Sequence, residues 1–142
     1  NCINSEKKSI ALKNFGKVLG NLNCNILNLQ YGNVDKEVEE FTNATNINFI
    51  NNHGINVYND IEGLAALIEI CDLIITIPNI TIHMSGALGK KGWVTVPFSP
   101  SFNWTNDRAT SLWYPNVNIF RQKKINDWTE VMIELEREAL NY

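Results

Sequence analysis

The chain has 142 residues, of which 44% are hydrophobic and 19% are charged, and its net charge is −3. This length is enough for one domain with a sizeable core, and the composition is ordinary for a globular protein. The negative charge balance gives no electrostatic argument for a nucleic acid or an anionic membrane as a partner. It is compatible with an anionic small ligand, because backbone N–H groups at a helix N-terminus bind phosphate without a basic surface.

The cysteine and histidine residues indicate neither a disulfide framework nor a metal site. Cys2, Cys24 and Cys71 form no CxxC pair, and an odd cysteine count is typical of a reducing compartment, so we expect a cytoplasmic protein. His53 and His83 have no neighbouring carboxylate pattern of the kind that binds a metal. No apolar run approaches the roughly 18 residues that a membrane-spanning helix needs.

The first half of the chain predicts alternating helices and strands. Apolar residues at helical spacing predict a helix over Leu12–Leu22. The next elements are predicted as a strand over Asn25–Gln30, an acidic helix over Val34–Thr42 and a weak strand over Ile47–Ile50. Asn59 is expected to begin a further helix, with Glu62 completing a capping box.

The second half continues the alternation and is richer in motifs. The apolar run Leu73–Ile77 predicts a buried strand ended by Pro78, followed by a helix from about Thr81 to Leu88. The remaining prediction is a strand over Trp93–Val96, an irregular segment over Pro97–Tyr114, a strand over Val117–Phe120 and a last helix capped by Asp127 and Glu130. An irregular segment of that length is unusual in a compact domain and suggests a functional loop.

This alternation predicts an α/β fold, a Rossmann-like parallel sheet with helices on both faces. Right-handed crossovers place the carboxyl ends of the strands at one edge, where ligands bind. Pro78–His83, Tyr31–Asn33 and Phe98–Arg108 are all expected at that edge. Such a sheet normally opens with a central strand, and the polar segment Asn1–Ser9 is unsuited to be one. We therefore expect residues 1–142 to be a single domain from a longer protein, with its first strand upstream.

The segment Cys71–Gly89 is the clearest candidate for a ligand site. A strand that feeds a helix through a tight turn is the unit that holds phosphate at a helix N-terminus. His83 lies near the start of that helix, where a ligand contact and a buried, hydrogen-bonded histidine are about equally expected. The hydroxyl groups of Thr81 and Ser85 are candidates to donate to a phosphate, although helix capping alone also explains Thr81.

The glycines that follow do not form a phosphate-binding loop. The run from Gly86 to Gly92 matches neither GxxxxGK[ST] nor GxGxxG, and it lies where glycines act as a helix C-cap and turn. A serine hydrolase is also disfavoured, because the chain has no GxSxG elbow.

Aromatic residues flank a charged pair in the long segment. Trp104, Trp113 and Tyr114 surround Asp107 and Arg108, an arrangement that suits stacking of a base and pairing with a phosphate. The same aromatic rings would also pin a long loop onto the sheet, and we favour that interpretation for Trp113 and Tyr114. Arg121 and Gln122 are expected to face either the same cleft or solvent.

Together these motifs resemble a known family. The matching runs, in order, are Gly63–Ile68, Cys71–Thr76, Asn79–Lys90, Trp93–Phe98, Trp104 with Asp107 and Arg108, Trp113–Pro115 and Phe120–Gln122. In this order and spacing, Asp60–Gln122 resembles the C-terminal domain of heptosyltransferase-like glycosyltransferases (glycosyltransferase family 9, GT-B fold). The form fused behind tetratricopeptide repeats in bacterial proteins is the most similar.

The resemblance implies a domain that binds a nucleoside-diphosphate sugar as substrate, without a metal or other cofactor. It places Asn79, Thr81, His83, Ser85 and Gly86 at the donor diphosphate. It implies a cleft shaped by Trp104, Asp107 and Arg108, and a nucleotide near Gln30, Tyr31 and Gly32. It also implies an N-terminal acceptor domain and, in the repeat-fused form, helical repeats outside this chain.

The catalytic base of such enzymes lies largely in the missing domain, so we expect this chain alone to bind donor weakly and transfer nothing. The chain has Pro78-Asn79-Ile80 where many relatives have Asp-Thr-Ala, which suggests an altered donor preference. The alternative is a non-catalytic nucleotide-binding or protein-interaction module of a repeat protein. The sugar, the base and the acceptor are left open.

Overall fold

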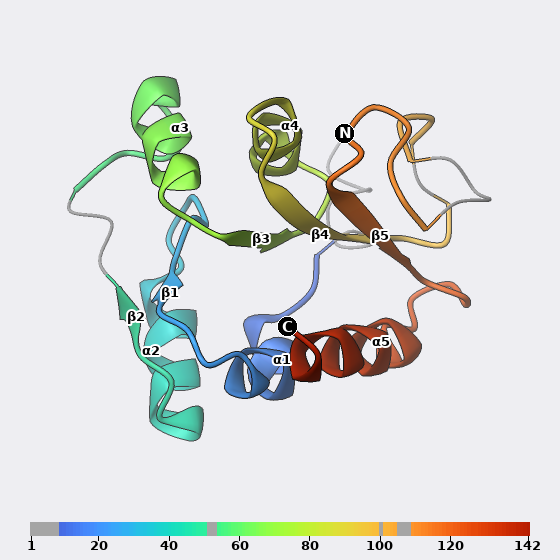
Figure 1. The fold of residues 1–142 in the computed structure, drawn as a ribbon. Helices are drawn as coiled ribbons and strands as arrows, with labels where there is room; N and C mark the ends of the chain where they lie inside the picture. The colour runs from blue at the N-terminus through green and yellow to red at the C-terminus, as the bar shows by residue number, and fades with distance from the viewer. Residues whose placement is uncertain (1–8, 51–53, 100, 105–108) are drawn as a thin grey trace. The chain divides into compact units, whose positions relative to one another are not determined.

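The computed structural model describes residues 9–50, 54–99, 101–104 and 109–142. They form an α/β fold in which parallel strands are flanked by helices (Figure 1). The predicted Rossmann-like class and the predicted order of helices and strands are both confirmed. The chain divides into two compact units. The N-terminal unit comprises residues 11–67 and 132–142, and the central unit comprises residues 68–131 with residues 9 and 10.

The N-terminal unit begins with a 3-10 helix, Leu12–Phe15, that continues into α1 (Gly16–Asn21). A two-stranded parallel sheet follows, made of β1 (Ile26–Leu27) and β2 (Phe49–Ile50) and connected by α2 (Asp35–Thr45). The backbone N–H of Leu12 donates to Glu37 Oε1 at 2.8 Å, which ties the first turn of the unit to α2.

Both strands of this unit are shorter than predicted. β1 ends after Leu27, because Asn28 Oδ1 accepts the backbone N–H of Gln30 at 2.9 Å and turns the chain. α2 runs three residues further than predicted, to Thr45, and the left-handed φ of 58° at Asn46 ends the helix. The ends of β1 and α2 are therefore set by a local hydrogen bond and a local backbone conformation. Hydrophobic periodicity does not predict such features.

The predicted capping box of the next helix is wrong by one residue. α3 spans Ile61–Glu69, and its cap is Asp60, whose Oδ1 accepts the backbone N–H of Gly63 at 2.7 Å. Asn59 and Asp60 both belong to the preceding turn, where their N–H groups donate to Asn56 O at 3.1 and 2.8 Å. Asp60 directly precedes α3, so its side chain lies in the N-cap position.

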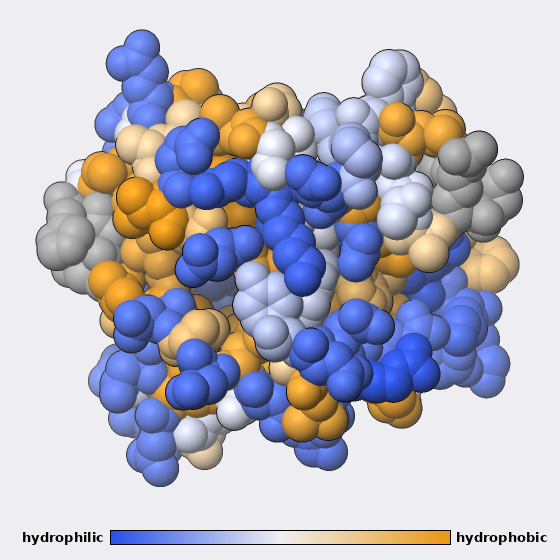
Figure 2. Space-filling view, in the orientation of Figure 1, coloured by the Kyte–Doolittle hydropathy of each residue, from blue (hydrophilic) through white to orange (hydrophobic). Residues whose placement is uncertain are grey.

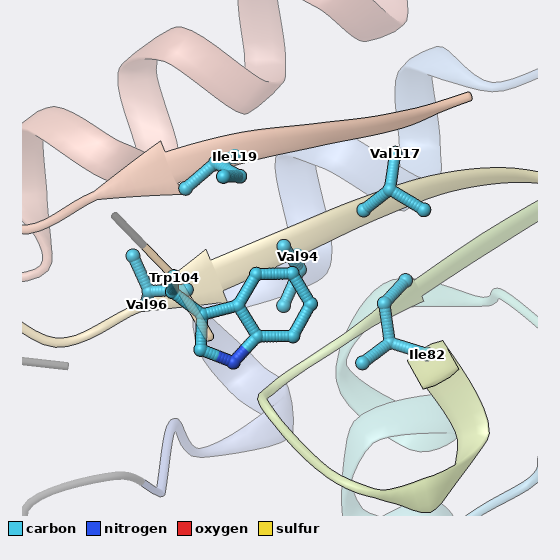
Figure 3. Close-up of a cluster of buried hydrophobic side chains, with 6 residues drawn as sticks. All are labelled: Ile82, Val94, Val96, Trp104, Val117 and Ile119. Atoms are coloured by element: carbon cyan, nitrogen blue, oxygen red, sulfur yellow. The ribbon is translucent and has the colours of Figure 1, made fainter. Parts of the chain in front are cut away.

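The central unit contains a three-stranded parallel sheet in the order β3 (Leu73–Thr76), β4 (Lys91–Val96) and β5 (Val117–Arg121). The helix α4 (Ile80–Ala87) connects β3 to β4 and packs on one face of the sheet (Figure 1). The buried side chains between them are Ile82, Val94, Val96, Trp104, Val117 and Ile119 (Figure 3).

β4 begins at Lys91, two residues earlier than predicted, because the strand continues through Gly92. A Cβ added at Gly92 would lie 2.6 Å from Ile82 Cδ1 and 3.2 Å from Val117 Cγ2. Gly92 therefore leaves the space that Ile82 of α4 occupies, and the strand can continue through it. The segment after β4 is also less irregular than predicted, since Thr110 forms an antiparallel bridge with Asn118 of β5.

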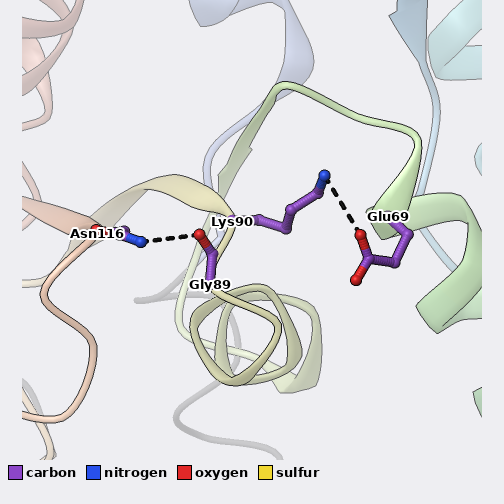
Figure 4. Close-up of polar contacts among 4 residues, drawn as sticks. All are labelled: Glu69, Gly89, Lys90 and Asn116. Carbon is purple, nitrogen blue, oxygen red and sulfur yellow. Dashed lines mark hydrogen bonds and ion pairs between the residues drawn. The ribbon is translucent and has the colours of Figure 1, made fainter.

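The end of α4 confirms that the glycine run is a helix C-cap and turn. Gly89 has a φ of 72°, its N–H donates to Gly86 O, and the N–H of Lys90 donates to Ser85 O at 2.8 Å. These are the two hydrogen bonds of a Schellman motif. Asn116 Nδ2 donates to Gly89 O, and Lys90 Nζ lies 3.4 Å from Glu69 Oε2 (Figure 4). Lys90 thus lies at the amino end of β4, away from the edge where ligands are expected.

The last helix, α5, spans Thr129–Leu140. Asp127 Oδ1 accepts the backbone N–H of Thr129, the first residue of the helix, at 3.0 Å. Glu130, the other half of the predicted cap, instead lies 3.1 Å from Lys123 Nζ. No helix in the described ranges combines the length and the apolar character needed to cross a membrane. On the face drawn in Figure 2, hydrophobic residues form small groups among hydrophilic ones.

Candidate functional site

The start of α4 is capped by Asn79. Its Oδ1 accepts the backbone N–H of Ile82 at 3.4 Å, and its Nδ2 donates to Thr76 Oγ1 at 3.0 Å. Asn79 therefore joins the carboxyl end of β3 to the first turn of α4. The suggestion that Thr81 caps this helix is wrong, since Thr81 lies within the first turn and is buried.

Ser85 hydrogen-bonds within the same helix. Its Oγ donates to Thr81 O at 2.7 Å, and the residue is 0% exposed. A hydroxyl donates a single proton, so the proton of Ser85 is already committed to α4. The proposed contacts of Thr81 and Ser85 with a diphosphate stay predictions, and the hydroxyl of Ser85 is not presented to a ligand in this arrangement.

His83 is a half-buried residue held between two aromatic side chains. Its Nδ1 lies 3.2 Å from the hydroxyl oxygen of Tyr114, and the two rings are arranged edge to face. The ring centroid of Trp104 lies 5.4 Å from that of His83, with the planes tilted by 35°. Of the two interpretations that the sequence left open, these contacts are those of a packed, hydrogen-bonded histidine.

Gly86 also faces Tyr114. A Cβ added at Gly86 would overlap the ring of Tyr114 and lie 2.7 Å from its Cβ. The glycine therefore lets the aromatic ring lie directly against α4. This contact explains a glycine at position 86 without a phosphate, whose binding there stays a prediction.

The long segment after β4 is fixed at both of its ends. Ser111 Oγ accepts the backbone N–H groups of Trp113 and Tyr114, both at 3.2 Å. At the other end, Arg121 Nη2 donates to Trp104 O at 3.2 Å. Gln122, which the sequence placed in a cleft or in solvent, is buried, and its Oε1 accepts the N–H of Phe98 at 3.1 Å.

The three aromatic residues of this segment have different roles. Tyr114 pins the loop on α4, as predicted, whereas the same prediction for Trp113 is wrong, because Trp113 is 65% exposed. Trp104 is 1% exposed and belongs to the core, so its ring is not available as a stacking surface. Asp107 and Arg108 lie outside the described residues.

The N-terminal unit contains a pocket of about 440 Å³ at the carboxyl ends of β1 and β2. Gln30, Tyr31 and Gly32, the residues predicted to lie near a nucleotide, all line it. The apolar part of its lining is Val34, Val38, Phe49, Ile50, Ile55 and Val57, and the polar part also includes Asn28, Asp35, Asn56 and Tyr58. The structure thus brings the three predicted residues together in one concave site.

Local sequence chemistry builds this pocket. After β1, Gly32 adopts a φ of 96°, and the N–H of Val34 bonds to Gly32 O at 3.2 Å as the chain enters α2. A residue with a side chain is strained at that φ, so glycine is the residue suited to this turn. The turn leaves Tyr31 exposed at the mouth of the pocket.

Sequence reasoning missed the other side of the pocket. Tyr58 packs against Tyr31 with ring centroids 5.6 Å apart and planes tilted by 45°. Asn56 Oδ1 accepts the N–H groups of Tyr58 and Asn59, which shapes the loop that carries Tyr58. The available signal was topological: this loop follows β2, the parallel partner of β1, so both loops leave the same edge of one sheet.

The described lining of the pocket carries one negative charge and no positive one. Among the described lining residues Asp35 is the only carboxylate, and none is lysine, arginine or histidine. The aromatic rings and amide groups suit a planar, neutral group, and the carboxylate suits a hydroxyl donor. None of the described lining side chains therefore brings a positive charge to the pocket.

Two of the described cysteines lie outside the pocket and the start of α4. Burial, and secondarily the charge of Asp72, raises the pKa of the Cys71 thiol, which favours the unreactive protonated form. Cys24 is exposed. Across the described part of the chain, no cluster of three or more His, Cys, Asp or Glu side chains is placed to hold a metal ion.

Comparison with known proteins gives one distant match. The chain is 29% identical to protein FlbA of Caulobacter vibrioides over 107 residues, which is 75% of this chain. The match spans only 17% of the length of FlbA. No protein-family model matches the chain, and no solved structure matches it significantly.

Proposed function

We propose that this chain is the nucleotide-sugar-binding domain of a glycosyltransferase that uses a nucleoside-diphosphate sugar. One observation carries the proposal: Gln30, Tyr31 and Gly32, which the family resemblance places near the nucleotide, line a pocket at the carboxyl ends of two parallel strands. In α/β sheets, that edge is where ligands bind. The volume of about 440 Å³ also lies within the range of small-molecule sites.

The chemistry of the lining supports the nucleoside as the group bound there. Tyr31 and Tyr58 offer aromatic faces for stacking on a base, and the amides of Gln30 and Asn56 lie on the same lining. Asp35 supplies a carboxylate that can accept hydrogen bonds from ribose hydroxyls.

For the diphosphate, the proposal relies on the resemblance alone, which assigns Asn79, Thr81, His83, Ser85 and Gly86 to that group. The positive end of the helix dipole and free backbone N–H groups favour an anion there without a metal. A donor bound in this way would be presented to an acceptor held by another domain, which would also supply the catalytic base. The proposal therefore predicts weak donor binding and no transfer by this chain alone.

The test is a titration followed by NMR, with ADP-, UDP- and GDP-sugars as the probes. We expect saturable shifts at Gln30, Gly32 and Tyr58. Tyr31→Ala should weaken binding by roughly 5- to 100-fold, the range for loss of one base–aromatic stack. Tyr142→Ala is the matched control, because Tyr142 is also an exposed tyrosine and does not line the pocket. If no nucleotide sugar binds, even with the upstream domain restored, the proposal is wrong.

The second candidate is a non-catalytic nucleotide-binding or interaction module. It is favoured by the engagement of His83 and Ser85 in contacts within the central unit, which leaves fewer groups for a diphosphate. The same titration separates the two candidates when nucleosides are included. A nucleoside that binds as tightly as its nucleotide sugar would indicate that α4 does not hold the diphosphate, and would favour the module.

A further inference from the structure

His83 contacts two points of the long segment between β4 and β5, one near its middle and one near its end. Trp104 packs on its ring at a centroid distance of 5.4 Å, and the Tyr114 hydroxyl lies 3.2 Å from its Nδ1. Trp104 and Tyr114 are ten residues apart in sequence but contact the same side chain. His83 is thus a common partner of two points on one loop.

We propose that His83 is a positioning residue that acts through Tyr114 and Trp104 to hold this loop on α4, and that it does not bind the donor phosphate directly. The inference rests on the proposed function only in its effect on donor binding. With the ring proton on Nε2, Nδ1 accepts the hydroxyl proton of Tyr114. The imidazole then orients the tyrosine, while its face packs on the indole of Trp104.

The surroundings of Tyr114 support a fixed position for its ring. Gly86 removes the side chain that would displace the ring from α4. Ser111 Oγ accepts the N–H of Tyr114, and the N–H of Val117 donates to Tyr114 O at 3.0 Å where β5 begins. The hydroxyl bond to His83 therefore completes a set of contacts that also hold the backbone and the ring.

The Trp104 end is held independently of the histidine. Its indole is buried in the core with Ile82 and Val96 (Figure 3), and its carbonyl accepts from Arg121 Nη2 at 3.2 Å. A change at His83 should therefore release the Tyr114 end first. The expected effect of a change at His83 is therefore confined to the residues around Tyr114, where it can be measured.

The experiment is a double-mutant cycle with two conservative substitutions. His83→Phe keeps a ring against Trp104 and removes Nδ1, and Tyr114→Phe keeps the ring against Gly86 and removes the hydroxyl. The two measurements are amide hydrogen exchange at Ser111, Tyr114 and Val117 and the Kd for the nucleotide sugar that binds best. Neither substitution removes a large buried group, so both variants should fold.

We expect each single variant to speed exchange at these amides and to weaken donor binding by roughly two- to tenfold, the range of one neutral hydrogen bond. The double variant should be no worse than either single one, because both remove the same bond. His83→Asn should restore much of the affinity, since its amide group lies where Nδ1 lies in the histidine ring.

Two results would overturn the inference. If His83→Phe weakens binding while Tyr114→Phe does not, the histidine contacts the donor directly. If neither variant changes exchange at Ser111, Tyr114 and Val117, the histidine does not hold the loop. A wild-type chain that binds no nucleotide would count against the proposed function instead, and the exchange measurements would still decide the role of His83.

Discussion

The start of α4 and the pocket of the N-terminal unit both follow parallel strands, but they use their polar groups differently. At α4, the side chains of Asn79, His83 and Ser85 bond to other parts of the central unit. In the pocket, Tyr31 and Gln30 are exposed. The region richer in motif residues is therefore the one whose side chains are more fully engaged by the fold.

A residue type that suits ligand binding suits internal hydrogen bonding equally well. A buried polar side chain must find a partner, since leaving it without one costs about 1–3 kcal/mol. Ser85 meets that need with a carbonyl one helical turn away. An exposed pocket residue is under no such demand, because water satisfies it until a ligand arrives.

The largest expected effect separates two tryptophans of the long segment. Trp104→Ala should lower the free energy of unfolding by about 3–5 kcal/mol, because it empties a buried site in the core. Trp113→Ala is the matched control and should change stability by no more than about 0.5 kcal/mol, because Trp113 is exposed. Urea unfolding measures both. Equal effects would mean that the loop is not anchored through Trp104.

A smaller effect is expected from a single methyl group on α4. Gly86→Ala should lower the free energy of unfolding by about 1–3 kcal/mol, since the added Cβ overlaps the ring of Tyr114. Gly20→Ala is the control, because Gly20 is also helical and the nearest atom to an added Cβ is Ile47 Cδ1 at 3.9 Å. It should be neutral or stabilise by up to about 1 kcal/mol. Thermal unfolding of the two variants would refute the packing argument if Gly86→Ala were stabilising.

The smallest effect concerns a surface carboxylate of the central unit. Hydrogen bonds from Thr129 hold the pKa of Asp127 below its ordinary value, so folding favours the ionised form. This stability is present above the unfolded pKa of about 3.9 and is lost as the pH falls through the lowered folded pKa. Asp127→Asn should therefore lose less stability than the wild type between pH 5 and strongly acidic pH. Parallel acid-unfolding curves for the two proteins would contradict this assignment.

Much of the fold was predictable because hydrophobic runs and their spacing report burial directly. The strand Leu73–Thr76 and the final helix follow from such patterns. Boundaries set by one side-chain hydrogen bond were missed, as at Asn28 and Asp60, because several nearby residues are equally able to make that bond. The extension of β4 through Gly92 depended on a neighbouring helix, which local sequence does not describe.

The candidate site was predictable in part for the same reason. The order of strand and helix placed Tyr31 and Gly32 at a sheet edge, and the family resemblance added Gln30. Tyr58 was missed because its contribution depends on a contact with Tyr31 across the pocket. The roles of His83 and Trp104 likewise depend on which of several aromatic residues come together in space.

The glycine inside β4 has a mechanical consequence. The side chain of Ile82 on α4 fills the space above Gly92 and packs against Val117. The helix and the sheet therefore interlock through this buried side chain. Sliding or rotating α4 would pull Ile82 out of this buried position. Close-packed protein interiors resist such displacements. The position of α4 on the sheet of the central unit is therefore fixed by packing. Any adjustment to a ligand there must come from the connecting loops.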